Sequence, residues 1–188
     1  MFRALCVFVG GFTLEAATAI VGDSDISTTS VLERVRSLID KSLVLLATSA
    51  TTEVPRFRTL ETIREFGLEQ LSASGEFDLV QERHARFFIE LAGEGGLEMG
   101  DAELRPWLDR LGSEHDNLRA VLQWSETAPE RGDAGVLLAS ALMMFWNVRG
   151  YFGEGREWYE RLLAMNRRSN GSPVARARAL WSAAFVAW

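Results

Sequence analysis

The sequence predicts a mostly α-helical protein in two parts: helices combined with a small β-hairpin, then an array of helices. Two observations lead to this class. Strand-like patterns are confined to residues 43–47 and 56–59, and from Glu76 onward apolar residues recur every three to four positions, as on the buried face of a helix. At 47% hydrophobic and 24% charged residues, the 188-residue chain has the composition of a globular protein with a real core.

The first 75 residues predict three helices, a hairpin and a fourth helix. Residues 2–9 form a short apolar helix that ends at Gly10-Gly11, and Thr13 is the N-cap of a second helix that reaches Gly22. A third helix starts near Ser30. Its predicted buried stripe consists of Val31, Leu32, Val35, Leu38 and Ile39. Strands at 43–47 and 56–59 and a helix from Leu60 to Ser74 follow. This order is that of a winged helix-turn-helix, which we assign to residues 1–75.

The remaining residues predict a helical linker over 76–128 and a repeat region over 129–188. The linker helices are expected at 77–92, 102–111 and 114–127, with Ser113 capping the third. Residues 133–149 and 153–165 form a helical hairpin joined at Gly150. The pairs Ala141-Leu142 and Ala179-Leu180 stand 38 residues apart, close to the period of tetratricopeptide-like hairpins.

The last predicted helix begins with Ser172 as cap and Pro173 at its first position, and the sequence stops at Trp188 before a partner helix. We therefore expect the last repeat to be truncated. Its uncovered apolar face predicts self-association.

Charge and cysteine content exclude several classes of protein. The formal net charge is −6, with −2 in residues 1–75 and −4 in the rest, so neither part is a basic nucleic-acid-binding module. Cys6 is the only cysteine, which excludes an internal disulfide. The apolar run Ala134–Val148 is shorter than a bilayer crossing and is expected to be a buried helix. We expect a cytoplasmic protein without a membrane partner.

Four stretches carry a resemblance to a known family: MFRALCVFVGGFTLEAA, LIDKSLV, RFRTLETIREFGLEQL and EHDNLRAVLQW. They resemble the region behind the nucleotide-binding core of bacterial STAND signal-transduction ATPases. These are NB-ARC-containing transcriptional regulators related to the LuxR-type, actinomycete antibiotic-regulator and maltose-activator groups. The resemblance implies a winged helix, a helical linker and tetratricopeptide repeats, and WNVRGYFGEGREWYERLL is similar to the family's first repeat.

The family's phosphate-binding motif G-x-x-x-x-G-K-[ST] does not occur in this sequence, so ATP hydrolysis by the family mechanism is not expected. In the family, a Met-His-Asp motif after the second wing strand contacts bound ADP, and Thr59, Leu60 and Glu61 take these three positions. Leu60 offers no hydrogen bond to a phosphate. The cofactor-binding candidates are therefore only Leu60 and Glu61, and the favoured interpretation is structural: Thr59 or Glu61 caps the helix and Leu60 fills the core.

Two cationic surfaces are candidates for binding. Arg34, Ser37 and Lys41 share an outward helix face, and Arg56 and Arg58 lie on the second strand. Because duplex binders neutralise about six to ten phosphates, this set predicts a docking surface for an ATPase core more readily than a DNA-reading one. In the repeat region, Arg149, Arg156 and Arg161 are candidates for a partner or inducer surface.

No catalytic, metal or cofactor site is expected. The two histidines, His84 and His115, are 31 residues apart, unlike a helical zinc-binding pair, and both are assigned structural roles. The sequence therefore predicts a non-catalytic regulatory segment of an ATPase-type transcriptional regulator. Its winged helix would act as an intramolecular latch on the ATPase core or a paralogue, and its repeats would contact a protein partner or inducer. The alternative is a small DNA-binding winged-helix regulator.

Overall fold

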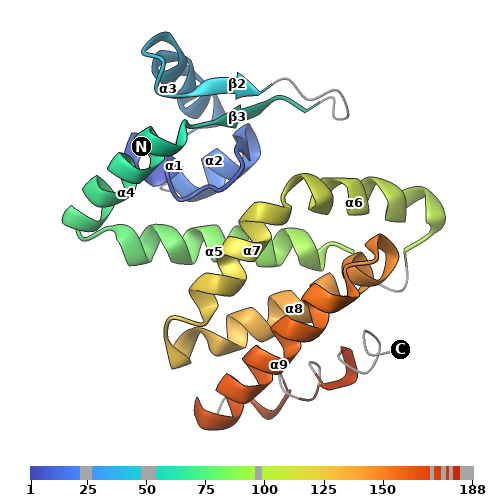
Figure 1. The fold of residues 1–188 in the computed structure, drawn as a ribbon. Helices are drawn as coiled ribbons and strands as arrows, with labels where there is room; N and C mark the ends of the chain where they lie inside the picture. The colour runs from blue at the N-terminus through green and yellow to red at the C-terminus, as the bar shows by residue number, and fades with distance from the viewer. Residues whose placement is uncertain are drawn as a thin grey trace. The chain divides into compact units, whose positions relative to one another are not determined.

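The computed structural model describes residues 1–21, 27–47, 54–95, 99–169, 172–174, 177 and 180–182 (Figure 1). They form two compact units, Met1–Phe87 and Phe88–Trp188. Both are mainly helical, and the first contains a small sheet, as expected from the sequence. The finer division at residues 75 and 128 stays a prediction.

The first unit has the element order of a winged helix-turn-helix. Its elements are α1 (Phe2–Leu5), β1 (Phe12–Thr13), α2 (Leu14–Val21), α3 (Thr28–Asp40), β2 (Leu45–Ala47), β3 (Arg56–Arg58), α4 (Glu61–Ala73) and the start of α5 (Phe77–Gly93). Helices α2 and α3 pack together as the helix-turn-helix pair, and β2 and β3 form the wing (Figure 1). The wing residues 48–53 lie outside the described residues.

A third strand joins the expected hairpin. The strand order is β1-β3-β2, with both neighbours antiparallel to β3 and with Phe12 and Leu46 opposite Phe57. The approach of β1 requires Gly11, whose φ is +113° and whose added Cβ would lie 2.7 Å from the carbonyl oxygen of Phe57. A two-residue strand is too short to show an alternating pattern, so β1 was not predictable by periodicity.

Helix boundaries in this unit differ from expectation where hydrogen bonding departs from the α pattern. Helix α1 ends at Leu5 rather than residue 9, because the amides of Cys6, Val7 and Phe8 bond to carbonyls three residues back. The predicted cap of α2 is confirmed, since Thr13 Oγ1 accepts from the amide of Ala16 at 3.2 Å. Helix α3 starts two residues earlier than predicted, capped by Ser27, whose hydroxyl accepts from the amide of Ser30 at 3.3 Å.

The core of the first unit is apolar and tightly packed. Its buried side chains include Leu5, Phe8, Phe12, Ile20, Val31, Val35 and Leu71. Helices α1 and α4 come so close that a Cβ on Gly67 would lie 2.1 Å from the sulfur of Cys6. Cys6 is buried, and burial raises the pKa of its thiol to about 11, which disfavours the reactive thiolate.

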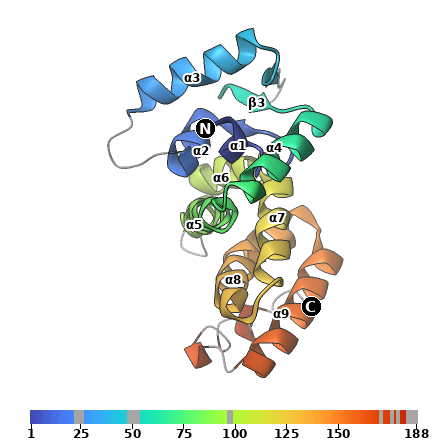
Figure 2. The same ribbon diagram turned by 90° about the vertical axis from the view of Figure 1, so that its left-hand side faces the viewer.

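The second unit is built from helices. After the end of α5 they are α6 (Asp101–Ser113), α7 (His115–Ser125), the short 3₁₀ helix η1 (Pro129–Arg131), α8 (Gly132–Arg149) and α9 (Phe152–Ser169). Helix α8 packs against both α7 and α9 (Figure 2). The predicted turn at Gly150 is confirmed: this residue caps α8 in the left-handed conformation at φ 75°. The predicted cap Ser113 is wrong, because its hydroxyl donates back to the carbonyl of Asp109 and α7 begins after Glu114.

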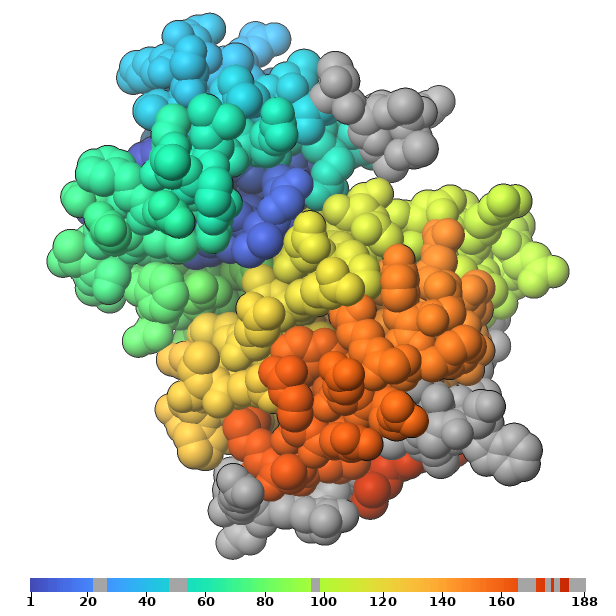
Figure 3. All heavy atoms as spheres, viewed as in Figure 1, coloured from blue at the N-terminus to red at the C-terminus, as the bar shows by residue number. Residues whose placement is uncertain are grey.

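The α8–α9 hairpin carries the core of this unit. Its buried side chains include Leu138, Leu142, Phe145, Trp146, Tyr159 and Leu162. The apolar run Ala134–Val148 is thus a helix that is buried along most of its length, as predicted, but Leu137 and Val148 are exposed. Gly135 allows the approach of α7 and α9, because a Cβ there would lie 2.2 Å from Ser125 Oγ and 2.7 Å from Leu162 Cδ2. In Figure 3 the orange spheres of α9 adjoin the yellow spheres of α7.

The last predicted helix is described only in part. Pro173, Val174, Ala177 and Leu180 to Ser182 are helical, and the amide of Ser172 donates to the carboxylate of Asp133 at 3.2 Å. Ala179, one of the residues that define the 38-residue spacing, lies outside the described residues.

Candidate functional site

The junction between β3 and α4 is the candidate cofactor site that the sequence singled out. Leu60 is the N-cap residue of α4, in extended conformation, and its side chain is 45% exposed. The expectation that Leu60 fills the core is therefore wrong. Phe57, 6% exposed, occupies the core instead, because the short strand β3 directs it inward and the chain then runs along the surface into α4.

The expected capping of α4 by Thr59 or Glu61 is also wrong. The N-cap position belongs to Leu60, which has no side-chain oxygen, and the helix start has no side-chain cap. The hydroxyl oxygen of Thr59 is buried and makes no hydrogen bond. The first amides of α4 and the positive end of its dipole thus lack the side-chain acceptor that usually satisfies them.

Glu61 pairs with Arg64 one helical turn away. Arg64 Nη2 lies 2.6 Å from Glu61 Oε1, and Arg64 Nε lies 3.0 and 3.1 Å from the two carboxylate oxygens. These hydrogen bonds lower the pKa of Glu61. Because the carboxylate is largely exposed, the pair contributes little to stability.

A pocket of about 260 Å³ lies at this junction. Its lining residues come from the turn before β1, from the β3–α4 junction and from the first turn of α4: Phe8, Gly10, Gly11, Phe12, Arg58, Thr59, Leu60, Glu61 and Arg64. Phe8 and Phe12 stack at 4.9 Å between ring centroids and form its apolar part. Because Arg64 is already paired with Glu61, Arg58 and the uncapped helix start are what the pocket offers to a polar or acidic group of a docking partner.

The α3 face has mixed charge. Arg34, Ser37 and Lys41 are exposed, as predicted, but Glu33 and Asp40 are exposed on the same helix. On β3, Arg58 is exposed and Arg56 is half-buried, on the opposite side of the strand from Phe57. Arg36, which the sequence analysis did not select, is a further exposed cation of α3.

The three repeat-region arginines lie in different environments. Arg149 forms an ion pair with Asp109 of α6, and Arg156 is exposed on α9. Arg161 bonds the Glu126 carboxylate through Nε at 2.7 Å, and its guanidinium lies 4.1 Å from the centre of the Trp158 ring. Two of the three candidates thus make contacts within the unit.

A polar cluster that the sequence analysis missed links α7 to the start of α9. Glu154 accepts from Arg119 at 2.9 and 2.7 Å, and His115 Nε2 lies 3.1 Å from the same carboxylate. Burial alone would raise the pKa of Glu154, but the hydrogen bonds from Arg119 and His115 outweigh it and hold the pKa at about 2. His115 and Arg119 are four residues apart on one helix, and this spacing is the feature of the sequence that indicates a shared polar face.

Other classes of site find no support in the described part of the chain. His84 is buried and its ring lies 5.3 Å from that of Phe8, as fits a structural role. Within the described ranges no group of histidine, cysteine and acidic side chains is arranged to hold a metal ion. None of the helices described there has the length and apolar character needed to cross a bilayer.

Known proteins similar to this chain are longer than it is. Over 182 residues, 96% of the chain, it is 38% identical to "Putative HTH-type transcriptional regulator Rv0890c" of Mycobacterium tuberculosis, and equally to a counterpart of the same description in Mycobacterium bovis. A second protein of M. tuberculosis, named "Uncharacterized protein Rv0894", is 33% identical over 103 residues, 52% of the chain and 26% of that protein. No family model and no solved structure matches. The chain spans about a fifth of the length of the regulators that it matches over nearly its whole length.

Proposed function

We propose that this chain is a non-catalytic regulatory segment of a larger, cytoplasmic transcriptional regulator of the STAND type. Its winged helix would dock on the nucleotide-binding core as a latch, and its helical hairpins would offer a surface to a partner or inducer. The similarity of nearly the whole chain to one fifth of a protein named as a transcriptional regulator supports this proposal.

The observation that carries the latch is the pocket at the start of α4. An uncapped helix start, Arg58, the Glu61–Arg64 pair and an exposed Leu60 lie together on the surface of the winged unit. Such a surface gains binding energy when a partner supplies the missing acceptor and covers the leucine. A latch needs only a few kcal/mol of difference in docking free energy between two states.

The alternative function is direct DNA binding through α3, the second helix of the helix-turn-helix. Exposed Arg34, Ser37 and Lys41 favour it, since this helix is the one that enters the major groove in helix-turn-helix proteins. Exposed Glu33 and Asp40 oppose it by repelling phosphates. We therefore rank docking above DNA binding.

The purified chain tests the two proposals when it is titrated in parallel with ADP, with duplex DNA and with the rest of the M. tuberculosis relative expressed as a separate polypeptide. Binding to the polypeptide, without salt-sensitive DNA binding, supports the latch. Leu60→Arg should weaken that binding, because Leu60 lines the pocket. Phe66→Arg is the matched control, since Phe66 is 55% exposed on α4 outside the pocket.

DNA binding that weakens steeply between low and moderate salt would instead identify a DNA reader and contradict the latch. ADP binding by the chain alone would show that the Leu60 junction holds nucleotide without a phosphate-binding loop.

A further inference from the structure

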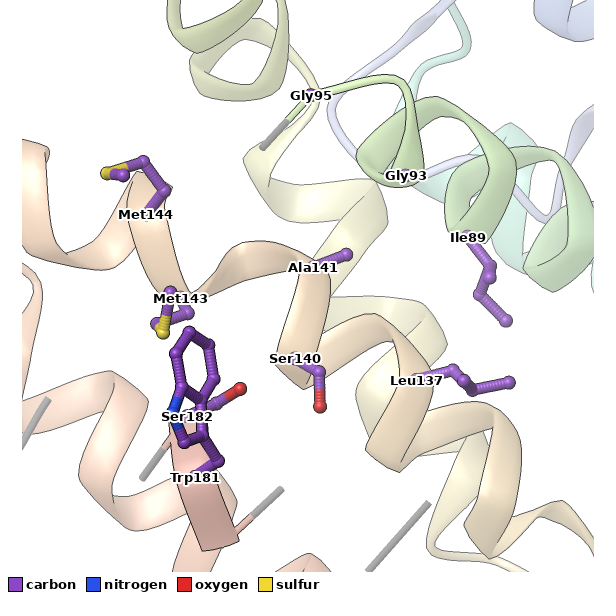
Figure 4. Close-up of a pocket in the computed structure, with 10 residues that line it drawn as sticks. All are labelled: Ile89, Gly93, Gly95, Leu137, Ser140, Ala141, Met143, Met144, Trp181 and Ser182. Carbon is purple, nitrogen blue, oxygen red and sulfur yellow. The ribbon is translucent and has the colours of Figure 1, made fainter. Parts of the chain in front are cut away.

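The second unit contains a pocket of about 310 Å³ to which nothing so far assigns a role. Its lining residues come from the end of α5 and the residue Gly95 beyond it, from one face of α8, and from the described part of the last segment: Ile89, Gly93, Gly95, Leu137, Ser140, Ala141, Met143, Met144, Trp181 and Ser182 (Figure 4). Its volume lies at the lower end of the range for small-molecule sites, about 300–1,000 Å³.

The lining residues that the structure describes carry no charge. All ten lining residues are glycine, aliphatic, methionine, serine or tryptophan. A charged ligand would lose its hydration in such a site without gaining an ion pair, which is costly. The composition therefore favours an uncharged ligand.

The apolar walls suit a flat, aromatic ligand. In Figure 4 the ring of Trp181 lies beside the side chain of Met143, and the side chains of Ile89 and Leu137 approach each other on the other side. Trp181 is 54% exposed and Leu137 is 40% exposed, whereas Met143 is buried. A ligand placed here would cover apolar surface of Trp181 and Leu137 and would gain contact with methionine sulfur and an indole face.

The two serines of the pocket leave one hydrogen bond for a ligand to make, as a donor to Ser140. The Ser140 hydroxyl donates to the carbonyl of Val136 at 2.8 Å, so its oxygen keeps the capacity to accept a hydrogen bond. The Ser182 hydroxyl bonds to Tyr159 and is buried. A ligand with a single N–H or O–H group matches this arrangement.

We propose that this pocket binds a small, uncharged, mainly aromatic molecule that packs on Trp181 and donates one hydrogen bond to Ser140. This inference rests on the proposed function, because it gives the ligand class for the inducer surface of the helical hairpins.

A matched pair of fluorescent probes tests the proposal on the full chain. N-Phenyl-1-naphthylamine is flat, neutral and carries one N–H, and 8-anilino-1-naphthalenesulfonate is the same skeleton with a sulfonate. We expect saturable binding of one neutral probe per chain, with energy transfer from tryptophan. The sulfonate should bind at least about tenfold more weakly, since an uncharged pocket does not replace its hydration.

Two glycine variants separate the pocket from the rest of the unit. Gly93 lines the pocket and an added Cβ there meets no atom within 4 Å, so Gly93→Leu should fold and occupy part of the space. We expect it to weaken binding of the neutral probe by about tenfold or more. Gly153→Leu is the control, because Gly153 also has no atom within 4 Å of an added Cβ and lies on α9 outside the pocket. Thermal unfolding followed by circular dichroism verifies that both variants fold.

Four results would overturn the proposal: no saturable binding of the neutral probe, equal affinity for the sulfonate, equal affinity in Gly93→Leu, or a dimer in sedimentation that dissociates when the probe binds. The last would identify a second copy as the natural occupant. The titration needs neither DNA nor a partner protein, so a negative result would contradict the ligand site and not the latch. A negative result in the docking experiment would contradict the latch and not the binding of a ligand in this pocket.

Discussion

The β3–α4 junction and the α7–α9 link use the same ion-pair chemistry at different depths. At the junction, the Glu61–Arg64 pair lies on the surface, with 65% of the Glu61 side chain exposed, and a buried Phe57 holds the chain below it. In the link, Glu154 is only 18% exposed and receives hydrogen bonds from both Arg119 and His115. The Glu61–Arg64 pair joins two residues of one helix, whereas the Glu154 cluster joins two helices and is shielded from water, so we expect only the second to contribute measurably to tertiary stability.

The largest expected loss of stability concerns the apolar side chains of the β3–α4 junction, buried Phe57 and exposed Leu60. Phe57→Ala removes a buried ring that packs on Phe12 at 5.8 Å, so it should destabilise the first unit by about 3 kcal/mol. Leu60→Ala, three residues away and half exposed, should cost less than about 0.5 kcal/mol. Urea unfolding followed by circular dichroism measures both. Similar losses would mean that Leu60 has a core role after all.

The second prediction concerns the buried polar link. The pKa of Glu154 falls from 4.5 to about 2, so Glu154→Gln should destabilise the second unit by about 2–3 kcal/mol at neutral pH. Because the folded pKa is depressed, this stability is present above pH 4.5 and is lost as the pH falls toward 2. All six tryptophans lie between residues 107 and 188, so tryptophan fluorescence in urea reports on this unit. A variant with the same acid sensitivity as the unaltered chain would contradict the assignment.

A third, smaller effect comes from a buried neutral hydrogen bond. The Tyr159 hydroxyl donates to the carbonyl of Ala139 at 2.7 Å and ties α9 to α8, and burial raises the pKa of Tyr159. Tyr159→Phe should cost about 1 kcal/mol at pH 7 by fluorescence-detected unfolding. A loss as large as that of Glu154→Gln would show that burial strengthens neutral and charged links alike.

The smallest effect is expected at the surface pair. Glu61→Gln keeps the size of the side chain and removes its charge, so stability should change by no more than a few tenths of a kcal/mol. The loss should shrink further at high salt, because exposed pairs are screened. A salt-independent loss above about 1 kcal/mol would place Glu61 in a stronger interaction than the structure contains.

The candidate sites illustrate why sequence patterns reach some residues and miss others. Arg34, Ser37 and Lys41 were predicted to be exposed, and they are, because helical periodicity separates the faces of α3 directly. Leu60 was misplaced because a leucine between a strand and a helix has no periodicity to fix its direction. Glu154 was missed because its partners lie 35 and 39 residues earlier: the spacing of His115 and Arg119 places both on one helix face, but it does not show which carboxylate they contact.

Local physical chemistry in the sequence determined the class of this fold. Apolar periodicity, the capping residue Thr13 and the left-handed turn at Gly150 depend on neighbours within a few residues, so they specify the helices and one turn without further information. Tertiary structure alone decided the rest: the pairing of β1 with β3 at Gly11, the exposure of Leu60, the cluster around Glu154 and the uncharged pocket beside Trp181. Each of these depends on residues that are far apart in the chain. Only the packing of helices and strands brings such residues together.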